Sequence, residues 1–101
     1  MPDGAAWITA SMAVKCSRPP RSHRMVLQLE KHKGRDWIVM ASSRPDLRIP
    51  DATGKQRWTV TFDRCDDAGW RVRMRISGTS HDGTAFKVNE VTSQVRVRCP
   101  K

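Results

Sequence analysis

Long apolar runs are missing from this sequence, and so is the spacing of apolar residues that marks a helix. No segment approaches the roughly 18 apolar residues that a membrane-spanning helix needs. The basic residues form no block of about five or six, which is the signature of a disordered tail that binds nucleic acid. These absences argue against a helical fold, a membrane span and a basic tail.

Motifs for catalysis and for cofactor binding are missing as well. The chain has no Gly-x-Ser-x-Gly elbow, no Walker loop and no dinucleotide fingerprint. Its three histidines fall in turns or at strand ends, and the adjacent carboxylates of Asp66 and Asp67 point apart or cap a turn, so no catalytic pair is indicated. The wide spacing of the three cysteines does not fit zinc ligands. We therefore expect a protein that is not an enzyme and that uses no cofactor and no metal.

The composition is that of one small, basic, folded domain. A chain of 101 residues is the length of a single domain, and 38% of its residues are apolar, which is enough for a small core. The formal net charge is +9, from 19 Lys and Arg against 10 Asp and Glu. Such a field favours acidic partners, whether another protein, an acidic polymer or nucleic acid, although it can also serve only to keep the protein dispersed.

Alternating apolar residues predict strands in six runs. They cover residues 6–16, 23–30, 36–41, 57–63, 69–78 and, less regularly, 85–99. Residues 42–56 are expected to be a long crossing loop or a short edge strand, and residues 1–5 to be flexible. Short strands with no helix between them predict an all-β fold, a two-sheet antiparallel β-sandwich of about seven strands.

Tryptophan is the main aromatic residue, and its phase within each run predicts its place. Trp37, Trp58 and Trp70 are in phase with aliphatic neighbours, so we expect them in the core; Val39 shares the phase of Trp37. Trp7 is out of phase with the apolar residues that follow it, which favours a sheet edge or a partner surface.

The last two runs are joined by an Asp82–Gly83 step, which predicts a hairpin turn. Folding about this turn pairs residues whose numbers sum to about 164 or 165. Cys65 and Cys99 then face each other, and we expect a disulfide between them. Closing this loop of about 35 residues would stabilise the fold by about 3 to 4 kcal/mol. Two alternatives stay open: Cys16 pairs with Cys99, or all three cysteines are reduced.

The run at residues 69–78 carries an arginine at every second position. Its apolar residues share the opposite phase and are expected to face the core. In the hairpin register that sums to about 165, Trp70 faces Val95 and Met74 faces Val91.

Acidic residues across this hairpin are expected to neutralise part of the arginine stripe. The same register pairs Arg75 with Glu90, and Arg98 with Asp67. The cations left without an acidic neighbour are Arg71, Arg73 and Arg96. We regard these three, together with Trp7, as the candidates for binding an acidic partner.

The segment CDDAGWRVRMRISGTSHDGTAF at residues 65–86, closed by VRVRC at 95–99, resembles the C-terminal half of a family of small secreted proteins. These are β-sandwich proteins of immunoglobulin or fibronectin type III character from actinobacteria. The matching features are a Cys before a Gly-aromatic strand opening and a Cys that ends the last strand, here Cys65, Gly69, Trp70 and Cys99. The likeness covers about residues 58–99, with a vaguer match over 24–42. The chain departs from antibody domains, because it has neither a tyrosine corner nor their Cys–Trp–Cys spacing.

The resemblance implies an exported, non-catalytic domain with an immunoglobulin-like or fibronectin type III-like fold that binds another protein, for example as an adaptor in a secreted toxin assembly. Residues 5–14 are apolar but follow no basic segment, so they do not make a convincing signal peptide. The expected form is therefore a mature secreted protein, with a cytoplasmic protein as the alternative. Binding of nucleic acid or another polyanion through the arginine face is the second function hypothesis, and a small inhibitor or toxin is the third.

Overall fold

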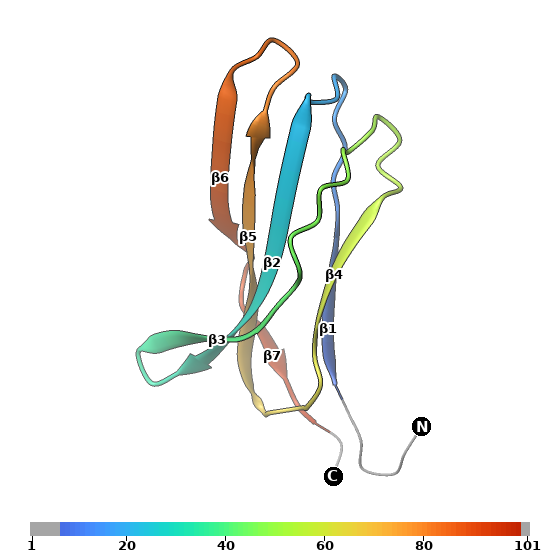
Figure 1. The fold of residues 1–101 in the computed structure, drawn as a ribbon. Coiled ribbons are helices and arrows are strands. Elements are labelled where there is room, and N and C mark those ends of the chain that lie inside the picture. Colours follow the sequence, from blue (N-terminus) through green and yellow to red (C-terminus); the bar gives the residue numbers. More distant parts are fainter. Residues whose placement is uncertain (1–6, 100–101) are drawn as a thin grey trace.

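The computed structural model describes residues 7–99, and these form seven strands and no helix. The strands are β1 (Ile8–Ala13), β2 (Ser22–Lys33), β3 (Asp36–Ser42), β4 (Arg57–Phe62), β5 (Ala68–Thr79), β6 (Ala85–Val91) and β7 (Val95–Val97) (Figure 1). The run predicted at residues 85–99 is thus divided into two strands. The predicted start of the first strand at Ala6 and the N-terminus predicted to be flexible lie outside the described residues. No helix able to cross a membrane is found in the described part of the chain.

The strands form two antiparallel sheets, which lie as separate layers with β1 and β4 to the right of the large sheet in Figure 1. The small sheet is the pair β1–β4. The large sheet has the order β3-β2-β5-β6, and β7 pairs with the start of β5, beyond the part that β6 covers. The prediction of an all-β fold with two antiparallel sheets and seven strands is confirmed.

The core lies between the two layers and comes from the apolar phase of each strand. Met25, Leu27 and Leu29 of β2 are at most 2% exposed. Trp58 of β4 and Trp70 of β5 are each 2% exposed, as predicted. Burying side chains of this size contributes about 1.5–3 kcal/mol each, so the centre of the large sheet is the best anchored part of the fold.

A β-bulge in β3 reverses the phase of the first part of that strand, because Met40 is an extra residue between Val39 and Ala41. The register shifts between Leu29 and Glu30, so that Trp37 lies opposite His32 and Val39 opposite Glu30, on the face of the large sheet that points away from the core. Val39 is 45% exposed, and Trp37 is not part of the core cluster. The prediction that Trp37 and Val39 point into the core is therefore wrong, because one extra residue moves side chains to the other face of a sheet.

A second irregularity separates β6 from β7. Trp70 pairs with Val95, as predicted, but it is Arg73 that pairs with Val91. The four residues of β5 from 70 to 73 are thus matched by five residues of the opposing segment, from 91 to 95. This extra residue shifts the register of β6 by one. The predicted pairing of Met74 with Val91 is wrong for this reason.

The shift also changes the surroundings of Glu90. Met74 pairs with Glu90, and Arg75 pairs with Asn89 instead of with Glu90 as we predicted. Since Met74 packs against the core, Glu90 occupies the core-facing phase of β6, although it is exposed. An exposed carboxylate in this phase means that the small sheet does not cover this part of β6.

The turn between β5 and β6 lies at the predicted Asp82–Gly83 step. The Ser80 N–H donates to the Thr84 carbonyl at 2.8 Å, and Gly83 has a φ of 93°, a value that side chains other than glycine rarely adopt. Between β3 and β4 the chain crosses from the large sheet to the small one as a loop, with an isolated bridge between Met25 and Asp46.

Cys65 and Cys99 form the predicted disulfide, with their Cα atoms 5.8 Å apart. It joins the segment before β5 to the residues that follow β7. The Cys99 N–H donates to Asp67 Oδ1 at 2.7 Å, so the partner of Asp67 is this backbone and not the Arg98 side chain that we predicted. Cys16 is free, and the alternatives of a Cys16–Cys99 bond or three reduced cysteines are wrong.

Candidate functional site

The outer face of the large sheet buries a carboxylate between two of the arginines that the sequence singled out. Glu30 is 4% exposed. Arg71 Nε donates to Glu30 Oε1 at 2.6 Å, and Arg73 Nε donates to Glu30 Oε2 at 2.8 Å. The prediction that Arg71 and Arg73 lack an acidic neighbour is wrong, because their partner comes from β2 and not from the hairpin across which we looked for it.

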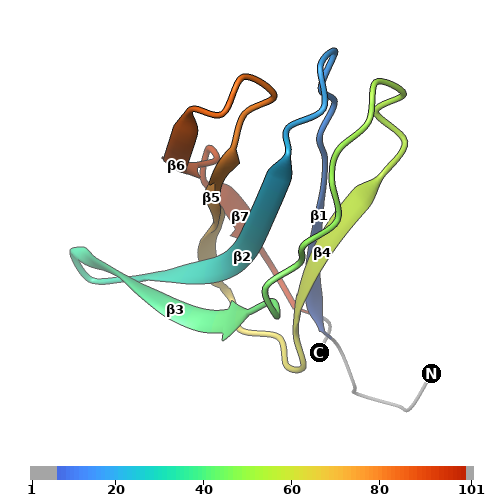
Figure 2. The ribbon, with the colours of Figure 1, turned by 45° about the horizontal axis from the view of Figure 1, so that its top comes forward.

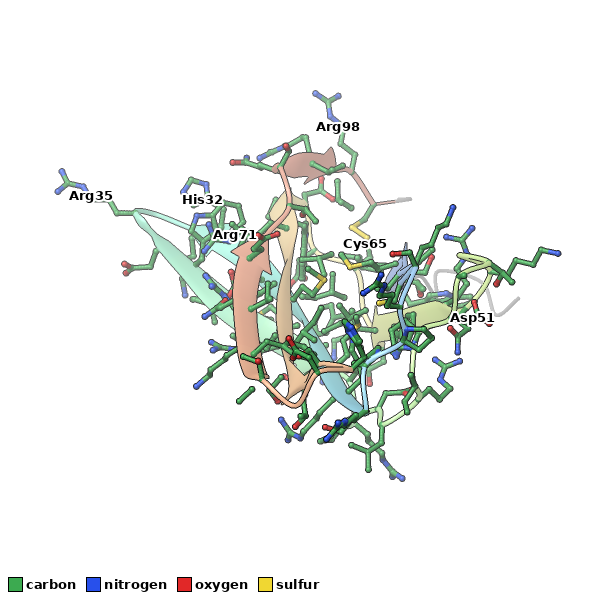
Figure 3. The ribbon with its side chains drawn as sticks, turned by 90° about the horizontal axis from the view of Figure 1, so that it is seen from above. His32, Arg35, Asp51, Cys65, Arg71 and Arg98 are labelled. Atoms are coloured by element: carbon green, nitrogen blue, oxygen red, sulfur yellow. A yellow bond between two sulfur atoms is a disulfide. The ribbon has the colours of Figure 1, made fainter. Side chains whose placement is uncertain are left out.

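Aromatic side chains of the β2–β3 hairpin cover Arg71. Its guanidinium carbon lies 4.2 Å from the ring centroid of Trp37, which in turn stacks on His32 at 4.8 Å. In Figure 3, His32 and Arg71 lie near each other beside the hairpin, while Arg35 at the hairpin tip points away from the molecule. A guanidinium over an indole is favourable by about 0.5–1 kcal/mol at a partly exposed site. Trp37 thus packs on the charged cluster instead of filling the core.

The electrostatics of this cluster keep Glu30 ionised. Burial raises the pKa of Glu30, but the hydrogen bonds and the positive charges of Arg73 and Arg71 lower it by more, so the pKa lies below its ordinary value. The two guanidiniums and the carboxylate therefore present one positive charge to a ligand where the sequence suggested two.

The arginines of β5 and β7 differ in how many hydrogen-bond and ion-pair partners they have within the protein. Arg73 Nη1 also donates to Asn89 Oδ1 at 2.7 Å, and Arg75 Nε donates to Gln28 Oε1 at 3.0 Å. Arg96 on β7 is exposed and makes no ion pair with any residue in the range 7–99. Of the three predicted cations, only Arg96 therefore stays available with its full charge.

A different surface lies where the edge of the small sheet approaches the edge of the large sheet. A cleft of about 180 Å³ opens there between β1 and β7. The apolar residues of its lining are Ile8, Ala10, Leu29, Trp70, Val72, Val95 and Val97. Figure 2 shows β1 beside β7, on the side of β1 that does not pair with β4. We call this line of approach, with residues 8–16 on one side and β6 and β7 on the other, the seam.

A second cleft, of about 260 Å³, continues the seam toward the other end of the sheets. Val14 and Cys16 line it from the β1 side, and Phe86 and Val88 line it from β6. His23 also lines this cleft; it is 4% exposed, and its Nδ1 has no hydrogen-bond partner among residues 7–99. Burial lowers the pKa of His23, so its ring is neutral at pH 7, and the positive charge on the lining of this cleft comes from Arg18.

Exposed apolar side chains border the seam. Val95 is 62% exposed although it lines the first cleft, and Val91 of β6 is 42% exposed. Trp7 is 54% exposed and directly precedes Ile8, which also lines that cleft. Apolar surface concentrated beside an apolar cleft is typical of a contact surface. The role of Trp7 as a partner contact stays a prediction.

Two residues of these surfaces were missed by the sequence reasoning. Val95 was assigned to the core, because alternation predicts the face of a strand but not whether another sheet covers it. Glu30 had a detectable signal: it follows Gln28 in the polar phase of its strand, and the chain has another strand with arginines in that phase. Pairing β2 with β5 would have brought these charges together.

Comparisons of the chain with family models, with curated proteins and with solved structures found no match. Within residues 7–99, no group of three or more His, Cys, Asp or Glu side chains is arranged to hold a metal ion. The seam and the cluster around Glu30 are therefore interpreted from their own geometry.

Proposed function

We propose that this chain is a non-catalytic binding module that contacts another protein through the seam. The observation that supports the proposal most directly is the 62% exposure of Val95 on the wall of an apolar cleft. Single exposed aliphatic residues are ordinary on a protein surface, but this one borders a cleft between two sheet edges. A partner that covers the seam would remove that apolar surface from water.

We also propose that the protein is exported and acts as an adaptor or structural component of a secreted assembly. The Cys65–Cys99 disulfide supports this, since such bonds persist in oxidising compartments and are rare in the cytosol. The likeness to small secreted proteins with immunoglobulin-like or fibronectin type III-like folds supports it too. In this proposal the fold supplies a rigid frame, and specificity comes from the seam.

Binding of a polyanion is the second candidate function, favoured by the net charge of +9 and by the exposed Arg96. The arrangement of Arg71 and Arg73 gives it no support, because Glu30 already occupies the Nε donors of both side chains. A polyanion would therefore be held by scattered cations and not by the stripe.

Photocrosslinking from inside the seam tests the proposal. A photoreactive amino acid replaces Val95, and in a matched control it replaces Ile38, which is 39% exposed on β3 away from the seam. We expect one partner protein to be crosslinked from position 95 in the native cells and not from position 38. The purified partner should then bind the unlabelled protein with a fixed stoichiometry, and Val95→Asp should abolish that binding.

Equal crosslinking from both positions, or binding of the partner that is unaffected by Val95→Asp, would overturn the proposal. Release of the partner by heparin, together with loss of binding in Arg96→Gln, would favour the polyanion function instead.

A further inference from the structure

The two strand edges that face the seam have unused backbone hydrogen-bonding groups. Among the described residues, β1 pairs only with β4, and β6 and β7 pair only with β5. Each strand therefore keeps one row of free N–H and C=O groups on the side toward the seam. Free edges of this kind accept an added strand, which gains main-chain hydrogen bonds.

The seam has the length and the direction of a single extended segment. The first cleft is lined by Ile8 and Ala10 against Val97 and Val95, and the second by Cys16 against Phe86. The chain thus runs in opposite directions on the two walls. At about 3.3 Å per residue, the wall from residue 8 to residue 16 spans about 26 Å, which is the length of about nine extended residues.

The inner side of the seam is apolar at both ends and would favour apolar side chains of a bound segment there. Ile8 and Val97 in the first cleft, and Val14 and Val88 in the second, are only partly buried and pack against the core cluster. Alternate residues of an added strand would point into these clefts and complete the burial. The ends of the segment therefore carry apolar residues in the inward phase.

The middle of the seam is acidic instead of apolar, because Glu90 lies there. It occupies the core-facing phase of β6 between Val88, which lines the second cleft, and Thr92, which lines the first. Glu90 is exposed and makes no ion pair with the residues from 7 to 99. A cationic side chain at the central inward position would pair with it.

The outer side of the seam is cationic. Lys87 of β6 and Arg96 of β7 are exposed and lie in the outward phase, opposite Ser77 and Gly69. The outward residues of β1, which are Thr9, Ser11 and Ala13, carry no charge. Outward acidic residues on an added strand would therefore meet positive charge, because the one acidic residue of the β6 wall, Glu90, points inward.

We infer that the seam takes up an extended segment of an acidic partner by strand addition, with apolar inward residues at its ends, a lysine or arginine facing Glu90 and acidic residues outward. This inference rests on the proposed function and names the partner's chemistry. The added strand pairs with β1 on one side and with β6 and β7 on the other, and so joins the two sheets.

Synthetic peptides test the inference on the full oxidised chain. The probe is a nine-residue peptide that alternates valine and glutamate, with lysine replacing the central valine. A shuffled peptide of the same composition, with its valines adjacent, is the control. Labelled-peptide anisotropy gives the affinities, and we expect the shuffled peptide to bind at least about tenfold more weakly, since it cannot place its valines in both clefts. Amide hydrogen exchange should slow in β1 and in residues 91–97 when the alternating peptide is added.

Charge reversal at Glu90 tests the register. Glu90→Lys should lower the affinity for the lysine-centred peptide by about fivefold and raise the affinity for a peptide with a central glutamate by a similar factor. Val95→Asp should weaken both peptides more than Ile38→Asp does. Because these residues are exposed, we expect the variants to unfold at the same urea concentration as the parent, which is measured alongside.

Equal binding of the shuffled peptide, protection at β3 or β4 in place of β1, or self-association at the seam without peptide would overturn strand addition. If the peptides do not bind but a partner is still crosslinked specifically from position 95, strand addition is wrong and the proposed function stands. If no such partner is found either, both fail.

Discussion

Replacing Glu30 with glutamine should destabilise the fold more than any change at an exposed charge. The carboxylate is 4% exposed and receives one hydrogen bond from each of two guanidiniums. Glutamine keeps the shape but loses the charge, which leaves Arg71 and Arg73 without their counter-ion. Breaking a fully buried ion pair costs about 3–5 kcal/mol. Because the two arginine side chains keep 20% and 22% exposure and can still reach water, we expect a smaller loss of about 2–3 kcal/mol.

The pH dependence gives this prediction a second readout. The pKa of Glu30 in the folded state lies below its ordinary value of 4.5, so over the interval between these two values the folded state binds fewer protons than the unfolded state. Stability from this group is complete above the unfolded pKa and is lost as the pH falls through the folded pKa. The difference between the parent and Glu30→Gln should therefore shrink below about pH 4.

Urea unfolding followed by tryptophan fluorescence measures both effects, since Trp58 and Trp70 are buried and become exposed on unfolding. A control variant replaces the whole cluster with apolar residues, Glu30→Leu with Arg71→Met and Arg73→Met. It should lie within about 1 kcal/mol of the parent, since no unpaired charge remains. A loss below about 0.5 kcal/mol in Glu30→Gln at pH 7, or a loss that stays constant down to pH 3, would refute the reasoning.

Three further predictions concern other parts of the molecule. Cys65→Ser with Cys99→Ser should lower the free energy of unfolding by about 3–4 kcal/mol; an unchanged urea midpoint would show that the bond is absent from the folded protein. Gly78→Ala should destabilise by about 1–3 kcal/mol in the same assay, because its Cβ would lie 2.2 Å from a carbonyl oxygen of β2; a neutral result would mean that the two strands lie farther apart. On a heparin column Arg96→Gln should elute at lower salt than Arg73→Gln, because Arg73 is paired with Glu30 whereas Arg96 has no acidic partner among residues 7–99; the reverse order would show that the arginines of β5 bind the polyanion.

Much of the fold was predictable because strand alternation and turn chemistry are local. The phases of Met25 and Leu27, the hairpin turn at Asp82–Gly83 and the pairing of Cys65 with Cys99 all follow from nearby residues. These features depend on which face of a strand is apolar and on where the chain reverses. Both properties are determined by short stretches of sequence.

The candidate site was less predictable because it depends on bulges and on the neighbours of each strand. One extra residue in β3, Met40, turned Trp37 outward, and another between β6 and β7 moved Glu90 from the arginine phase to the core-facing phase. No residue type marks either bulge. The placement of β2 beside β5, which brings Glu30 to Arg71, joins segments about 40 residues apart, and the strand pattern alone leaves such pairings open.

The disulfide gives the seam a dependence on oxidation state. β7 contains three residues and pairs with β5 only over residues 95–97, so its own hydrogen bonds hold it weakly. The bond at Cys99, two residues beyond its end, keeps this short strand in place. Without it, one wall of the first cleft would detach while the rest of the large sheet persists. If a partner segment binds at the seam as we propose, reduction should release it before it unfolds the protein, and binding would then require oxidised thiols.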